Sequence, residues 1–149
     1  MFKQTVLFYQ KMGKYKFKNR KFPKEFKTVS RYIEEKKGVR VTLGHFTSFL
    51  GHFTREIVIH HNYDLKNNGL FALLHECGHS LQPPTNVGIN SYKNLDETER
   101  PDEYRMGRFL NEVDAWSRGY KLANTIGIPI NKKKWDLQRE RALLTYFEK

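Results

Sequence analysis

Cysteine is almost absent from this 149-residue sequence, which contains only Cys77. A single thiol can form no intrachain disulfide and cannot supply the cysteine pairs of a zinc ribbon. Long apolar runs are missing too: Val6–Tyr9 is far shorter than a signal-peptide core, and no stretch approaches the roughly 20 apolar residues of a membrane span. We therefore expect a cytoplasmic protein that is neither secreted nor inserted in a membrane.

Acidic residues are scarce in the N-terminal part of the chain. Residues 1–40 hold 13 Lys/Arg against 3 Asp/Glu, whereas the remainder is nearly neutral and the whole chain has a net charge of +11. Such a basic segment can attract nucleic acid, an acidic protein or another anionic surface. It can equally be a solvated face that keeps a small protein soluble, and no nucleic-acid-binding motif accompanies it.

The hydrophobic content of 38%, with 14% aromatic residues, is enough for a packed core in one domain. We divide residues 1–149 into a basic N-terminal hairpin and helix (1–38), a core (39–126) and a C-terminal helix (127–149). No internal repeat, flexible linker or run of coiled-coil heptads is present, so a monomer is expected.

The pattern of apolar residues predicts an α+β fold. Strands are expected at 39–43 and 56–60, and helices at 23–37, 70–81, 102–125 and 133–147. Residues 5–18 suggest a basic hairpin, and residues 85–100 lack periodicity and suggest a long surface loop. We expect a small antiparallel or mixed sheet packed on the helix at 70–81 and on the helix at 102–125.

The segment His75-Glu76-Cys77-Gly78-His79 has the pattern H-E-x-x-H on a predicted helix. Two histidines four residues apart lie about 40° apart around a helix, so both imidazoles can reach one ion. Glu76 lies beside that face, where it can hold a metal-bound water and take its proton. Leucines surround the motif and indicate burial, and buried imidazoles need partners or a metal. An ordinary helix surface is the alternative interpretation.

A third metal ligand is expected downstream, because a catalytic zinc takes three protein ligands and leaves one position for water. No histidine follows His79, so the candidates are the carboxylates of Glu112 and Asp114. Glu112 shares its helix face with small residues that would let another helix approach closely. Asp114 instead shares its face with Arg118 and Lys121, which could pair with it. The pattern favours Glu112. The small residues are Ala115, Gly119 and Ala123.

Together with the segment Asn111–Trp116, this motif resembles the gluzincin branch of zinc metallopeptidases, and within it the small phage and bacterial ImmA/IrrE-like domains. The resemblance covers residues 39–126 and implies a minimal zincin-like domain. It implies one Zn²⁺ ion held by His75, His79 and Glu112. It also implies Glu76 as the general base.

The same resemblance implies a place for the substrate. The strand carrying Ile57, Val58 and Ile59 should border the cleft and pair with an extended protein or peptide substrate by strand addition. We therefore predict a zinc metallopeptidase that hydrolyses peptide bonds with a zinc-bound water activated by the motif glutamate. The alternative is a basic nucleic-acid or virion-associated binding protein with a structural or vestigial zinc site. A DNA-associated protease would combine both features.

Peptide hydrolysis also needs a donor for the developing oxyanion besides the metal. Tyr92, Tyr104 and Tyr120 are the candidates, although each can equally be a packed aromatic residue. Cys77 lies about 200° around the helix from the first motif histidine, so we expect a buried, inert thiol. Ordinary surface or hydrogen-bonded roles are expected for His45, His52, His60 and His61.

Overall fold

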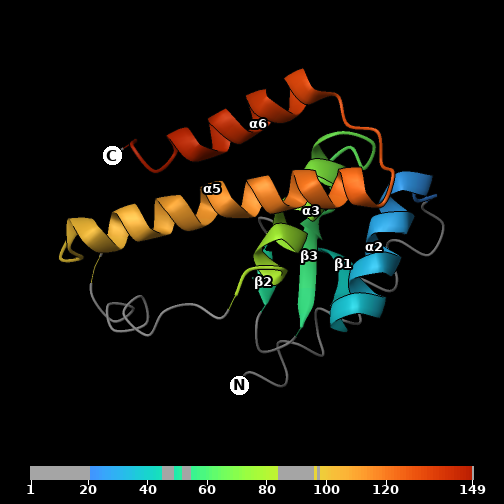
Figure 1. Ribbon diagram of the computed structural model, residues 1–149, viewed down its shortest axis with the longest axis horizontal. Coiled ribbons are helices and arrows are strands. Elements are labelled where there is room, and N and C mark those ends of the chain that lie inside the picture. The colour runs from blue at the N-terminus through green and yellow to red at the C-terminus, as the bar shows by residue number, and fades with distance from the viewer. Residues whose placement is uncertain (1–20, 45–48, 52–54, 84–95, 97, 149) are drawn as a thin grey trace.

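The computed structural model describes residues 21–44, 49–51, 55–83, 96 and 98–148. In chain order they form α2 (Lys24–Lys37), β1 (Arg40–Gly44), β2 (Phe49–Gly51), β3 (Glu56–His60), α3 (Asn68–Ser80), α5 (Asp102–Thr125) and α6 (Lys132–Leu144). Within these ranges the chain has four helices and one three-stranded sheet, which confirms the α+β class (Figure 1). None of the described helices has both the length and the apolar content needed to cross a membrane.

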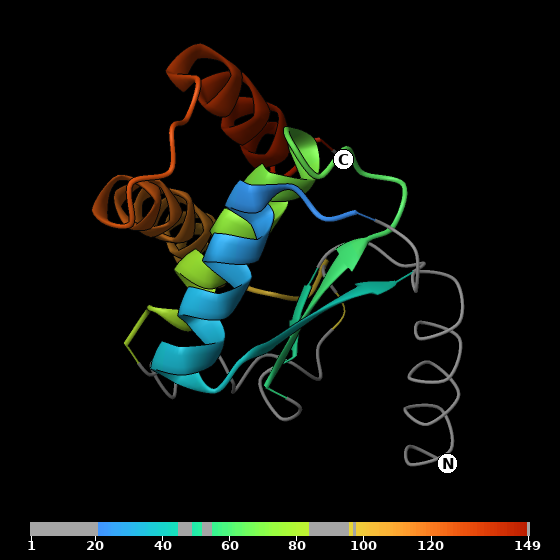
Figure 2. The same ribbon diagram turned by 90° about the vertical axis from the view of Figure 1, so that its right-hand side faces the viewer.

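The sheet has β3 at its centre. Strand β1 pairs with β3 in parallel and β2 pairs with it in the antiparallel sense, so the sheet is mixed. Ile57 and Ile59 alternate along β3 and are fully buried, while Val58 between them is half-buried. Figure 2 shows α2 and α3 against one face of the sheet, with α5 and α6 beyond α3. The core therefore lies between the sheet and the helices.

Helix α2 joins this core through one stripe of side chains. Phe26, Val29 and Ile33 recur at helical spacing, and all three are buried. Gly38 ends the helix with φ at 64°, a left-handed conformation that suits glycine, and its N–H donates to the Glu34 carbonyl at 2.8 Å. The helix predicted here is confirmed.

Strand β2 and the end of α6 differ from the sequence prediction. The pattern predicts a connection at 49–51, but these residues pair with β3, in a stretch too short to show alternation. Helix α6 ends at Leu144 rather than Phe147, because the N–H groups of residues 145–147 donate to carbonyls three residues earlier and tighten the last turn. The hairpin predicted within 1–20 and most of the loop predicted at 85–100 lie outside the described residues.

Helices α3 and α5 pack closely because glycines lie where they meet. A Cβ atom on Gly78 would lie 1.9 Å from the carbonyl oxygen of Ala115. In the same way, a Cβ atom on Gly119 would lie 2.4 Å from the carbonyl oxygen of Leu74. The close approach predicted from the small residues of α5 is therefore confirmed, and it sets Glu112 opposite the motif helix.

Adding one methyl group at this contact is expected to destabilise the protein. In Gly78→Ala the new methyl would meet backbone that cannot rotate away, so we expect the free energy of unfolding to fall by about 3 kcal/mol. Denaturant unfolding followed by circular dichroism measures the change. Gly107→Ala on α5 is the matched control: its Cβ would have no heavy atom within 4 Å, and alanine should stabilise the helix by about 0.5–1 kcal/mol. Equal stability of the two variants would contradict the close contact.

Candidate metal centre

Helix α3 presents His75, Glu76 and His79 at one end of the core. Nine of its 13 residues are buried, so these polar side chains lie in a largely apolar setting. The two imidazole rings lie 4.7 Å apart between centroids, on one face of the helix. Each histidine side chain is 14% exposed and that of Glu76 is 9% exposed. The motif is therefore not an ordinary solvated helix surface.

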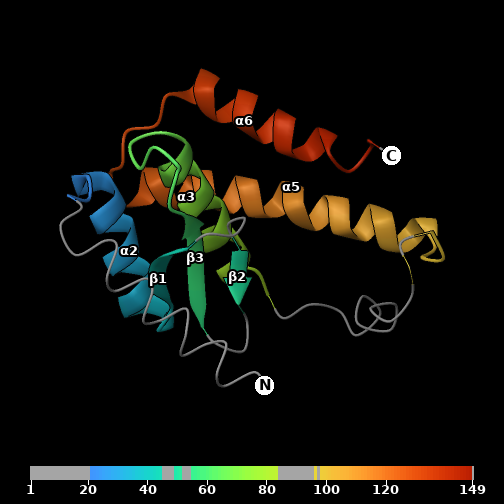
Figure 3. The same ribbon diagram turned by 180° about the vertical axis from the view of Figure 1, so that it is seen from behind.

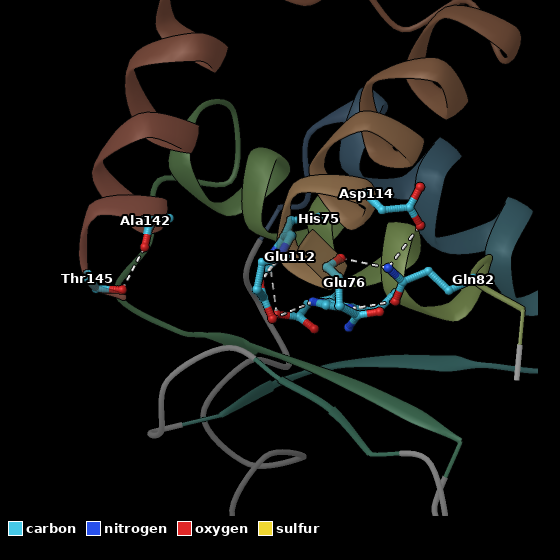
Figure 4. Close-up of polar contacts among 9 residues, drawn as sticks. His75, Glu76, Gln82, Glu112, Asp114, Ala142 and Thr145 are labelled. Carbon is cyan, nitrogen blue, oxygen red and sulfur yellow. Dashed lines mark hydrogen bonds and ion pairs between the residues drawn. The ribbon is translucent and has the colours of Figure 1, made fainter. Parts of the chain in front are cut away.

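Glu112 of α5 reaches both imidazoles. Its Oε2 lies 2.9 Å from Nε2 of His75, and its Oε1 lies 3.3 Å from Nε2 of His79. Figure 4 shows the Glu112 carboxylate beside His75, between the two helices and above the sheet. Asp114, the other candidate, turns away and pairs with Arg118 at 2.7 Å. The structure thus brings together the three residues predicted as ligands.

The three donor groups are spaced as a small divalent ion requires. Their ligand atoms all lie within 4.8 Å of one another. In a tetrahedral zinc site with ligand distances of about 2.0–2.1 Å, neighbouring donor atoms lie about 3.3 Å apart. The two nitrogen–oxygen distances of 2.9 and 3.3 Å are close to that spacing. Two imidazoles and a carboxylate therefore fit one small divalent ion such as zinc.

The two carboxylates of the centre have opposite electrostatic settings. Burial opposes ionisation of Glu112, but hydrogen bonds from His75 and His79 outweigh it and hold the pKa of this carboxyl well below its usual range. Burial also acts to lower the pKa of His79, yet the hydrogen bond and charge of Glu112 raise that pKa overall. For Glu76, burial raises the pKa and the neighbouring imidazoles offset only part of the effect. Glu112 is therefore suited to stay ionised as a ligand, and Glu76 is suited to exchange a proton.

Gln82, just after α3, fixes the orientation of His79. Its Nε2 donates to the Asn111 carbonyl at 2.7 Å and to Asp114 Oδ2 at 3.1 Å, so its Oε1 must face the imidazole. That oxygen lies 3.0 Å from Nδ1 of His79 and accepts a hydrogen bond from it. With one proton fixed on Nδ1, a neutral His79 would present the lone pair of Nε2 to a metal in place of the hydrogen bond that this nitrogen makes with Glu112. The sequence pattern did not indicate this residue, because its role depends on the Asn111 carbonyl of α5.

Removing this support is expected to weaken metal binding without removing a ligand. In Gln82→Met the side chain keeps a similar volume but can no longer hold the tautomer of His79, so zinc affinity should fall about tenfold. Competition with a chelating dye measures the affinity. Gln138→Met is the matched control, because the Gln138 side chain donates a hydrogen bond to the Asn68 carbonyl, at 3.4 Å, and not to a residue of the centre. This variant should bind zinc like the wild type. Identical affinities for both variants would contradict the role of Gln82.

His75 is oriented by stacking instead. Its ring lies nearly parallel to that of Trp116, with centroids 4.5 Å apart and an interplanar angle of 15°. Trp116 meets Trp135 of α6 edge-on at 4.9 Å, and both tryptophans are buried. Trp116 therefore belongs to the core, and the aromatic pair ties α6 to the centre.

A hydroxyl donor that the sequence pattern did not single out also faces the centre. Tyr146 follows the last turn of α6, with the Arg108 guanidinium 5.7 Å from the centre of its ring, and it lies close enough to Glu112 for that carboxylate to affect its pKa. Burial and the negative charge of Glu112 raise the pKa of Tyr146 to about 12, so the group stays protonated. Figure 4 shows the end of α6, with Ala142 and Thr145, to the left of the centre. Nothing in the spacing of the terminal helix predicts this contact, because it depends on the tightened last turn.

The tyrosines proposed from sequence are placed differently. Tyr104 and Tyr120 lie eight residues from Glu112 toward the two ends of α5, which is about 12 Å along the helix axis. Tyr104 is buried, and the ring of Tyr120 lies 5.8 Å from that of Trp135. Tyr92 lies outside the described residues. The oxyanion role of these three tyrosines stays a prediction.

The strand residues predicted to bind substrate lie at the centre of the sheet. Ile57 and Val58 are paired with β1 on one side and β2 on the other, so a substrate strand could reach them only by displacing a neighbour. The edge strand beside the metal centre is β2, whose Leu50 N–H donates to the Glu76 carboxylate. A substrate role for Ile57, Val58 and Ile59 stays a prediction.

Among the described residues, Cys77, His60 and His61 lie outside the ligand set. Cys77 is fully buried, and burial raises the pKa of its thiol, which suits the inert role predicted for it. Nδ1 of His61 lies 3.0 Å from the Gly44 carbonyl oxygen, a hydrogen-bonded position of the expected kind. His45 and His52 lie outside the described residues.

Comparison with known proteins assigns no family to this arrangement. No protein-family model matches the chain, and neither a curated protein nor a solved structure matches it. A functional assignment therefore depends on the residues of the centre and on their geometry.

Proposed function

We propose that the chain is a zinc-dependent metallopeptidase of the gluzincin type, with one zinc ion held by His75, His79 and Glu112. The observation that carries the proposal is the convergence of a carboxylate from α5 on both imidazoles of an H-E-x-x-H helix. Structural zinc sites have four protein ligands, most often including cysteine, whereas catalytic sites have three and keep one position open. Among the described residues the group has three members and no cysteine, which favours the catalytic kind.

The residues divide the work of hydrolysis between them. A zinc ion held by His75, His79 and Glu112 would lower the pKa of a bound water toward about 7 and would polarise a carbonyl group. Glu76, with its raised pKa, takes the proton of the attacking water and passes it to the leaving amine. Its Oε1 lies 3.6 Å from Nδ1 of His75, and it does not belong to the group of three donors, so it stays outside the ligand set. The hydroxyl of Tyr146 is a candidate donor to the developing oxyanion.

The substrate class of this reaction is a peptide or an unfolded protein segment. We also propose that the chain is related to ImmA/IrrE-like domains. This part of the proposal depends on the resemblance of the two motifs around His75 and Glu112. A nucleic-acid or acidic partner for the basic N-terminal segment, residues 1–40, is a separate proposal, and residues 1–20 of that segment lie outside the described part of the chain.

Removal of the metal tests the proposed function. The purified protein is expected to contain one zinc ion per chain, to hydrolyse casein slowly, and to lose this activity when a chelator removes the zinc. Adding zinc back should restore it, because the ligands are ordered by contacts that do not need the ion, such as those of His79 with Gln82. Metal analysis and release of labelled peptides measure both quantities. Undiminished hydrolysis by zinc-free protein would contradict the proposal.

A further inference from the structure

A groove lies between α5 and α6, next to the metal centre. It encloses about 560 Å³, which is within the range of small-ligand pockets. Figure 3 shows α6 running back along α5 toward the C-terminus. Most of the lining side chains are apolar, and these are Phe109, Val113, Leu143, Leu144 and Phe147. Arg139 and Glu140 also line the groove, and their charges are opposite, so it has no net charge.

The groove adjoins the metal-binding carboxylate. Phe109 and Val113 lie on α5, three residues before and one residue after Glu112. The ring of Phe109 meets that of Phe147 at 5.1 Å and that of Tyr146 at 6.3 Å. Because Tyr146 contacts Phe109 of the groove, one helical turn from Glu112, this side chain stands at the border between the groove and the centre. A ligand in the groove would therefore lie beside the metal.

The chemistry of the groove favours an apolar ligand. Leu144 and Phe147 are 55% and 70% exposed, so a considerable apolar surface faces solvent next to the centre. Covering it with an aliphatic or aromatic side chain removes apolar area from water. A charged side chain would lose hydration there without a net opposite charge to compensate.

We propose that this groove binds an apolar side chain of the substrate, from a residue close to the scissile bond. The inference rests on the proposed peptidase function and adds the substrate class: peptides in which an aliphatic or aromatic residue lies next to the cleaved bond. A second copy of this chain is the competing occupant of the same surface.

Binding is measured first, with zinc-loaded Glu76→Gln protein, which keeps the groove. Short polar peptides that differ at one position, with Leu, Phe, Ser or Asp, are titrated against it. The Leu and Phe peptides should bind on the order of tenfold more tightly than the Ser and Asp peptides. Adding Leu144→Glu should remove this difference. Leu137→Glu should preserve it, because Leu137 is 46% exposed on the same helix and does not line the groove.

Three outcomes would overturn the inference. These are equal affinities for all the peptides, equal effects of the two glutamate substitutions, and a dimer in sedimentation that Leu144→Glu alone dissociates. The last would assign the surface to a second copy of the chain.

Turnover by the wild type then separates this inference from the proposed function. Products identified by mass spectrometry should be cut next to the apolar residue. Hydrolysis without an apolar preference would overturn the groove inference alone. An apolar preference in binding, with no hydrolysis by any zinc-loaded protein, would overturn the proposed function and leave the groove as a peptide-binding site.

Discussion

Replacing Glu76 by Gln is expected to abolish peptide hydrolysis while leaving the zinc and the fold in place. The amide has the shape of the carboxylate but cannot take a proton, and loss of a general base lowers the rate by about 10²–10⁴-fold. Glu76 is buried, with a raised pKa, and lies outside the ligand group, so its loss should not release the metal. Peptide turnover, zinc content and the thermal midpoint of unfolding are the three measurements.

Glu103→Gln is the matched control for this substitution. Glu103 lies in the first turn of α5 and is exposed, so the same change of charge there should leave turnover unaltered. If the chain were instead a basic nucleic-acid or virion-associated binding protein with a structural zinc site, neither substitution should change its affinity for its partner. Full hydrolytic activity of Glu76→Gln would contradict the role of Glu76 as the base, and loss of its zinc would place this residue among the ligands.

Replacing Glu112 by Gln is expected to weaken zinc binding more than any substitution around the ligands. Loss of a group that only supports a ligand costs about 10–100-fold in metal affinity, so loss of this charged ligand should exceed about 100-fold. The carboxylate contacts both imidazoles, at 2.9 and 3.3 Å, and among the described residues the group of donors contains no other acidic residue. Zinc affinity is measured by dye competition, and hydrolysis should fall with zinc occupancy.

Asp114→Asn is the informative comparison, since Asp114 was the other downstream candidate. Asp114 pairs with Arg118 at 2.7 Å and reaches His79 only through Gln82. The zinc affinity of the Asp114→Asn variant should therefore fall by no more than about tenfold. If Asp114→Asn lost zinc while Glu112→Gln kept it, the assignment of the third ligand would be wrong.

Much of this architecture could be predicted from local sequence pattern. The stripe Phe26, Val29 and Ile33 predicts α2, and the glycine at position 38 predicts where it ends. Both signals are local, because a buried helix face and a left-handed cap are encoded by residues that are neighbours in the chain. Small residues on one face of α5 predict the close approach to α3, and that approach selects Glu112 over Asp114.

The features that the pattern could not predict depend on contacts between distant segments. Strand β2 has only three residues and exists because β3 pairs with it. Gln82 is recognisable only once α5 supplies the Asn111 carbonyl that fixes its amide. The periodicity predicts that the terminal helix continues past Tyr146. Instead the last turn of α6 tightens after Leu144, and Tyr146 lies in this tightened turn, near Glu112.

X-ray absorption at the zinc edge of the wild-type protein tests most directly whether two imidazoles and one carboxylate hold the ion. We predict one zinc per chain with only nitrogen and oxygen neighbours, at about 2.0–2.1 Å, and the multiple-scattering signature of two imidazoles. A sulfur neighbour at about 2.3 Å, or the absence of stoichiometric zinc binding, would contradict the convergence of His75, His79 and Glu112 on a single metal ion.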